Sequence, residues 1–257
     1  MRDLVEVAHG VHVATSQVYT TTSTVVVGED GACLVVDPAV TAREVDGLAA
    51  VIRDRGWTPV AVWSTHAHWD HVLDGPGFSR LPRWSEGVAE TDAETLAAER
   101  DADPELARTG EAPAPVAAIR TPYPQRSPGV LDWAGPPVHV LAHQAHCRQH
   151  TALVLPDVGV LLAGDMLSDV EIPLLDLTAA DPVGDYRAAL DLLASVGADV
   201  VVPGHGRVGS ADELSRRLVA DRAYLAALVA GSPWEDDRLA LPWAAAAHEA
   251  QRSALAP

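Results

Sequence analysis

The stretch Thr65-His66-Ala67-His68-Trp69-Asp70-His71 places three histidines and one aspartate within six residues. It comes directly after residues 60–64, a short apolar run that indicates a buried strand. Imidazole and carboxylate groups suit zinc, and they also suit iron or manganese. Histidines in a polar loop can also be purely structural, but this density of ligands at the end of a strand favours a metal site.

Further candidate ligands follow later strands. His146, Asp165 and His205 come at or soon after the ends of three apolar runs that predict strands, residues 138–142, 160–163 and 199–202. Taken alone, each is a weak signal, because a single histidine after a strand is more often structural and a Gly-Asp pair is usually a turn. In this order behind the first motif, the three residues predict a site with enough ligands for two metal ions.

The complete pattern, His-x-His-x-Asp-His followed by histidine, Gly-Asp and Gly-His, resembles the metallo-β-lactamase superfamily over nearly the whole chain. The resemblance implies an α/β fold, a four-layer αββα sandwich in which two mixed β-sheets are flanked by helices. The spacing from His146 to Gly164-Asp165 makes His146 the expected ligand in preference to His143. The implied ligands are His66, His68 and His146 for one metal, Asp70, His71 and His205 for the second, and Asp165 between both.

The same resemblance implies a hydrolase that binds two divalent ions, with zinc expected first and iron or manganese as alternatives. Two adjacent cations lower the pKa of a water molecule between them and so supply hydroxide at neutral pH. That hydroxide would attack the carbonyl of an ester, thioester or lactone. Asp70 is expected to be catalytic as well as a metal ligand, because it would orient the nucleophile.

Three other functions stay open. A β-lactamase has the same fold, but such enzymes typically lack the aspartate that Asp165 matches. A mononuclear iron oxidoreductase similar to persulfide dioxygenases would use only His66, His146 and Asp165. A binding protein without activity could retain the fold, although such members usually lose ligands and all seven are present in this sequence.

The loops beside the expected metals depart from the family pattern at two places. Gln144-Ala145 stands where Pro-Gly usually precedes the histidine, and Leu73-Asp74-Gly75 stands where Gly-Gly is common. Both changes concern loop shape, and therefore the substrate more than the metals. The roles of His143, Cys147 and His150 stay open, as does the physiological substrate.

Charge restricts the partners. The 257 residues include 36 acidic and 18 basic side chains, all of the latter arginine, so the formal net charge is −18. Such a surface repels polyanions, which argues against nucleic acid or an anionic membrane and favours a small-molecule substrate.

The N-terminus lacks the features of a signal peptide and no apolar run reaches the roughly 18–20 residues of a membrane span, so a cytoplasmic enzyme is expected. The oligomeric state is not predicted.

The remaining pattern predicts one domain over residues 1–257. Capping-box patterns begin at Thr41 and at Ser210, and each predicts the start of a helix. Prolines crowd residues 111–137 and exclude regular helix or a central strand there. We therefore expect an excursion at about residues 75–137 that roofs the site. The other expected elements are strand pairs at 4–14 and 24–36, helices at 85–108 and 182–195, and strands at 138–142, 152–155, 160–163 and 199–202.

Overall fold

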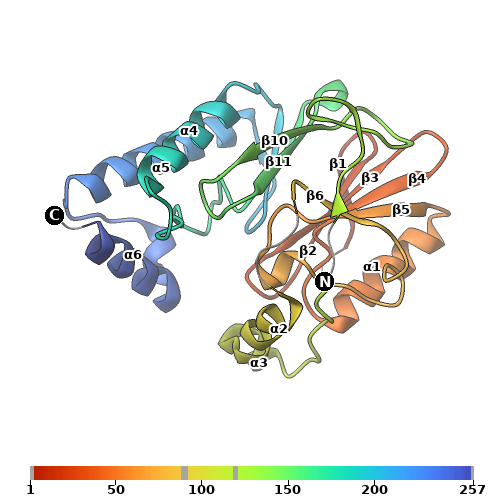
Figure 1. The fold of residues 1–257 in the computed structure, drawn as a ribbon, viewed down its shortest axis with the longest axis horizontal. Coiled ribbons are helices and arrows are strands. Elements are labelled where there is room, and N and C mark those ends of the chain that lie inside the picture. The colour runs from red at the N-terminus through yellow and green to blue at the C-terminus, as the bar shows by residue number, and fades with distance from the viewer. Residues whose placement is uncertain (1–2, 88–91, 118–120, 256–257) are drawn as a thin grey trace.

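The computed structural model describes residues 3–87, 92–117 and 121–255, and in these residues two seven-stranded mixed sheets pack face to face (Figure 1). The strand order is β1-β2-β3-β4-β5-β6-β7 in the first sheet and β14-β13-β12-β11-β10-β9-β8 in the second. Helices cover both outer faces. The predicted four-layer αββα sandwich is therefore confirmed.

The first sheet takes its strands from the N-terminal half of the chain. Strands β1 to β4 are antiparallel neighbours, whereas β5, β6 and β7 each run parallel to the preceding strand. Helix α1 (Ala42–Asp54) makes the crossover between the parallel strands β4 and β5. The strands are β1 (Val5–Ala8), β2 (Val11–Thr15), β3 (Thr22–Val27), β4 (Ala32–Val36), β5 (Thr58–Trp63), β6 (Arg83–Ser85) and β7 (Thr121–Pro122).

The second sheet comes mainly from the C-terminal half. Strands β12 and β13 are parallel and are joined through α4 (Pro182–Ala194), while their other neighbours are antiparallel. Helix α5 (Ala211–Val229) packs beside α4 on the outer face. The strands are β8 (Gln125–Ser127), β9 (Val130–Leu131), β10 (His139–His143), β11 (His150–Leu155), β12 (Val160–Gly164), β13 (Val200–Pro203) and β14 (Gly209–Ser210).

Alternation along the central strands explains the layers. In β4, Leu34 and Val36 face the core between the sheets, whereas Cys33 and Val35 pack towards α1. Burial on both faces is why β4 is apolar without interruption. The two sheets are also joined by a hydrogen bond, in which Trp63 Nε1 donates to Thr151 Oγ1 at 3.2 Å.

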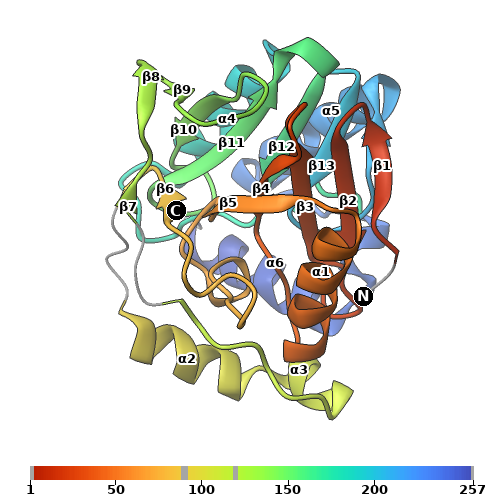
Figure 2. The same cartoon turned by 90° about the vertical axis from the view of Figure 1, so that its right-hand side faces the viewer.

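Three further helices lie at one end of the sandwich, below the sheets in Figure 2: α2 (Ala93–Ala102), α3 (Pro104–Thr109) and α6 (Pro242–Ala254). Short 3₁₀ turns complete the secondary structure: η1 (Trp69–His71), η2 (Pro156–Val158) and η3 (Asp237–Ala240). Helix α2 packs against η1, the turn that carries Asp70 and His71. No helix among the described residues is long and apolar enough to cross a membrane.

The helix predicted at residues 85–108 is wrong at its start. Ser85 ends strand β6, residues 88–91 lie outside the described part of the chain, and α2 begins only after its N-cap Asp92. The helical stretch is also interrupted, because Pro104 cannot continue α2 and instead opens α3 at its first position. Within the proline-rich segment, β7 and β8 form sheet edges, where prolines are tolerated. The short strand β9 lies between β8 and β10, so the expectation that this segment contains no inner strand is wrong there.

Candidate metal centre

The ends of strands from both sheets carry the seven predicted ligands to one place. His66 and His68 lie in the loop after β5, and η1 carries Asp70 and His71. His146 lies between β10 and β11, Asp165 directly follows β12, and His205 follows β13. Their ligand atoms form two groups, each within 4.8 Å: His66, His68, His146 and Asp165, and then Asp70, His71 and His205.

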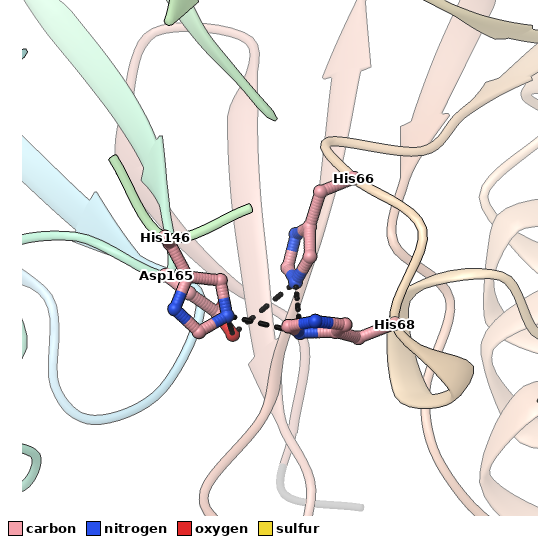
Figure 3. A group of neighbouring side chains, drawn as sticks. All are labelled: His66, His68, His146 and Asp165. Carbon is pink, nitrogen blue, oxygen red and sulfur yellow. Dashed lines mark hydrogen bonds and ion pairs between the residues drawn. The ribbon is translucent and has the colours of Figure 1, made fainter. Parts of the chain in front are cut away.

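In the first group, four side chains converge from two sides (Figure 3). His68 Nδ1 lies 3.1 Å from His66 Nε2 and 2.9 Å from His146 Nε2. Asp165 Oδ2 lies 3.4 Å and 3.3 Å from the same two Nε2 atoms. Tetrahedral zinc with bonds of about 2.0–2.1 Å keeps its ligand nitrogens roughly 3.3 Å apart, so this spacing fits a metal ion.

The second group lies on the other side of Asp165. His71 Nε2 and His205 Nε2 are 3.2 Å apart, and Asp70 Oδ2 lies 3.5 Å and 3.3 Å from them. Asp165 Oδ1 is 3.1 Å from His71 Nε2, and Asp165 Oδ2 is 3.3 Å from His205 Nε2. The carboxylate of Asp165 therefore lies between the two groups.

One atom of this carboxylate lacks a partner of its own. Asp165 Oδ1 is buried and makes no hydrogen bond within the described residues, although His71 Nε2 is within ion-pair distance. A buried carboxylate oxygen without a hydrogen bond is costly. The donor set to which this oxygen belongs consists of five imidazoles and two carboxylates and suits divalent metal ions. Such an ion would give Asp165 Oδ1 the partner that it lacks.

Neighbouring oxygens fix the orientation of three of the imidazoles. His71 Nδ1 donates to Asp37 Oδ2 at 2.9 Å, His146 Nδ1 donates to the Leu174 carbonyl at 3.0 Å, and His205 Nδ1 donates to the Tyr19 carbonyl at 3.2 Å. Each contact places a ring proton on Nδ1 and directs Nε2 into the site. Contacts of this kind support metal affinity in proteins.

Asp37 is a supporting residue that the sequence reasoning missed. Its carboxylate holds His71 and also accepts from Thr65 N at 2.9 Å and from Thr65 Oγ1 at 2.6 Å. It is buried and takes a left-handed backbone conformation with φ +48° directly after β4. An aspartate at the end of an apolar strand is the same signal that identified Asp165, and it could have been used here.

The pKa values separate the two groups. Burial lowers the pKa of His66 and His146 and, together with the His146 charge, lowers that of His68 to about 3. Burial also acts on His71 and His205, but at both the nearby carboxylates outweigh it, and the pKa of His205 rises to about 10. The first group therefore presents neutral imidazoles, whereas the second holds protons that a metal ion must displace.

Glu171 is a buried carboxyl group beside the second group, and the sequence did not single it out. Its Oε1 lies 3.8 Å from His205 Nδ1. Burial raises the pKa of Glu171 to about 7, and the charges of Asp165 and Asp70 add to this rise, while His205 opposes it. Glu171 is thus an acidic group near the ring nitrogen of His205 that also contacts the Tyr19 carbonyl.

His150 and His143 form a support behind the first group. His150 stacks on His66 with ring centroids 4.8 Å apart, and its Nε2 accepts from the Asp165 backbone N–H at 3.0 Å. The proton of His150 is therefore on Nδ1, which lies 3.1 Å from His143 Nε2. Neither residue belongs to the two ligand groups. Cys147 is also outside them, and burial raises the pKa of its thiol to about 12.

Comparison with known proteins identifies the fold and the family. The profile described as Metallo-beta-lactamase superfamily matches residues 18–205. A metallo-beta-lactamase family protein of Thermus thermophilus, TTHA1429, is 23% identical, with 96% of this chain and 92% of that chain covered and a TM-score of 0.66. TTHA1623, solved in a di-iron-bound form, is 25% identical (80% and 97% covered, TM-score 0.58), and BLEG-1, a B3 metallo-beta-lactamase, is 19% identical (78% and 93% covered, TM-score 0.57). No curated protein matches the sequence significantly.

Proposed function

Because the chain belongs to the metallo-beta-lactamase superfamily, we propose that it is a hydrolase that uses two divalent metal ions to cleave an ester, thioester or lactone in a small molecule. The observation that carries this proposal is the position of Asp165, whose two oxygens face the Nε2 atoms of both ligand groups at 3.1–3.4 Å. A single carboxylate placed in this way fits two ions held side by side.

Two ions bound here would polarise a substrate carbonyl and lower the pKa of a bound water molecule. The protein supplies the geometry for that chemistry. His66 and His146 are held neutral by burial, so their lone pairs are available without the loss of a proton. Asp70, besides its place in the second group, can accept a hydrogen bond from the attacking oxygen and so orient it.

We propose zinc as the native metal. The ligand groups consist of nitrogen and oxygen atoms, and such donors suit zinc, iron and manganese. The likeness to TTHA1623 in its di-iron-bound form supports iron as the second candidate. Metal analysis of the purified protein separates these possibilities, and one iron per chain would instead favour the mononuclear oxidoreductase.

Esters and thioesters are proposed over β-lactams because of the leaving group. A thiolate or alkoxide can depart without protonation, whereas an amine requires a proton from a general acid. The presence of Asp165 favours the same substrates, since β-lactamases of this fold typically lack that aspartate. The likeness to BLEG-1 keeps β-lactam hydrolysis as the alternative to be tested.

The test is a hydrolysis screen on one metal-loaded preparation, with aryl esters, thioesters, lactones and a cephalosporin, and with the metal content measured in parallel. We expect close to two ions per chain and a kcat/KM for the best ester or thioester at least about tenfold above that for the β-lactam, roughly 1.4 kcal/mol of transition-state discrimination. His66→Ala and His68→Ala are the controls that should abolish turnover. Absence of bound transition metal after reconstitution would refute the metal centre, and faster β-lactam cleavage would refute only the substrate class.

A further inference from the structure

The orientation of His146 depends on a backbone segment that is distant in sequence. His146 Nδ1 donates to the carbonyl of Leu174 at 3.0 Å. Leu174 lies between β12 and α4, in a stretch without regular secondary structure. Because such a segment has no ladder of hydrogen bonds of its own, something else must hold this carbonyl in place.

The C-terminal helix α6 supplies that contact through Gln251. The side-chain oxygen of Gln251 accepts from Leu175 N at 2.7 Å, and its Nε2 donates to the Pro173 carbonyl at 3.1 Å. Gln251 therefore binds the backbone on both sides of Leu174. The orientation of the amide is unambiguous, because a backbone N–H can only donate and a backbone carbonyl can only accept.

The Gln251 amide is itself held on its other side. Its Nε2 also donates to Tyr224 Oη at 2.7 Å, and the Tyr224 hydroxyl donates in turn to His248 Nδ1 at 3.1 Å. Gln251 is 3% exposed, and Tyr224 is fully buried. A buried amide with all of these groups satisfied has one strongly preferred position, so it can fix the segment that it contacts.

We infer that Gln251 is a positioning residue for the metal centre: by binding residues 173 and 175 it fixes the Leu174 carbonyl, and this carbonyl aims His146 at the first metal. The inference rests on the proposed two-metal function. Helix α6 lies beyond residues 18–205, the part of the chain that the superfamily profile matches. The C-terminal helix thus has a part in metal binding as well as in packing.

The test uses Gln251→Leu, which keeps most of the volume and removes both hydrogen-bonding groups. Gln251→Glu is a second variant, because it keeps an acceptor for Leu175 N and loses the donor to the Pro173 carbonyl. The matched control is Thr41→Ala, which removes a buried hydroxyl that caps α1 and so lowers stability, without touching Gln251 or its two backbone contacts. Each protein is titrated with zinc against a chromophoric chelator, and its metal-free Tm is measured.

Loss of a group that orients a metal ligand typically lowers affinity about tenfold to a hundredfold. We expect Gln251→Leu to weaken one ion by this factor and Gln251→Glu to weaken it less, while Thr41→Ala lowers Tm and leaves both zinc affinities unchanged. Repeating Gln251→Leu with His205→Ala, which disables the second group, should keep the weakening and so assign it to the first.

Two results would overturn the inference: a Gln251→Leu protein with both zinc affinities of the wild type, or equal weakening of both ions. If Gln251→Leu does not fold, Gln251→Glu decides by the same criteria. Failure of the proposed function is a different result, because the wild-type protein itself would then bind no zinc or hydrolyse no ester.

Discussion

Asp165 is the residue on which the two ligand groups depend jointly. Its oxygens lie within 3.1–3.4 Å of four imidazole nitrogens, two from each group. The charges of His205, His71 and His66 outweigh burial and hold its pKa well below the usual range, so the carboxylate stays charged. The carboxylate of Asp165 therefore connects the two ligand groups.

We therefore expect Asp165→Ala to lower the affinity for both zinc ions together, by at least about tenfold each. Competition titration with a chelator measures the two dissociation constants. Asp157→Ala is the matched control, because Asp157 is an exposed aspartate on η2, the turn that joins β11 to β12. If Asp165→Ala weakens only one ion, or retains full activity and full metal load, Asp165 does not bridge.

At the scale of single residues, the sequence was informative about groups that act at strand ends. All seven predicted ligands come together, and His146 rather than His143 enters the first group. The groups that orient them were not predictable. Backbone carbonyls such as those of Tyr19 and Leu174 carry no signal in side-chain identity, since any residue could supply them.

At the scale of elements, the helices that begin with a local capping signal were predicted, whereas a helix without such a signal was missed. The capping box at Thr41 is present in full, with Thr41 accepting from Glu44 N and the Glu44 side chain bound to the Thr41 backbone. At Ser210 only the first half of the box forms within the described residues: its hydroxyl accepts from Glu213 N, while the Glu213 side chain pairs with Arg216. Helix α6 was missed, because Leu241 offers no side-chain cap that would signal its start.

The cap of α1 can be tested directly. Thr41 is 2% exposed, and besides capping α1 its hydroxyl donates to Glu111 Oε2 at 2.8 Å. Thr41→Ala should therefore lower the free energy of unfolding by about 1 kcal/mol or somewhat more, measured by urea denaturation. Thr41→Ser keeps the hydroxyl and should recover most of the loss. Equal destabilisation by both variants would mean that packing of the Thr41 methyl group matters and the cap does not.

At the scale of the whole molecule, charge acts on the substrate before the metal centre does. The formal net charge is −18, and a field of that sign repels anionic substrates at long range. Salt screens this field: the Debye length falls from about 30 Å at 0.01 M to about 10 Å at 0.1 M ionic strength. The approach of a charged substrate should therefore depend on salt, whereas the chemistry at the buried centre should not.

We accordingly predict that kcat/KM for an anionic ester or thioester rises several-fold between about 0.01 M and about 0.1 M ionic strength, because screening removes the repulsion. A neutral ester with the same leaving group is the control and should change little, which excludes a general effect of salt on the enzyme. The expected change lies in kcat/KM, with kcat at saturation nearly constant. A fall in kcat/KM with salt for the anionic substrate would contradict the prediction, and would show that local positive charge attracts the substrate more strongly than the net charge of the protein repels it.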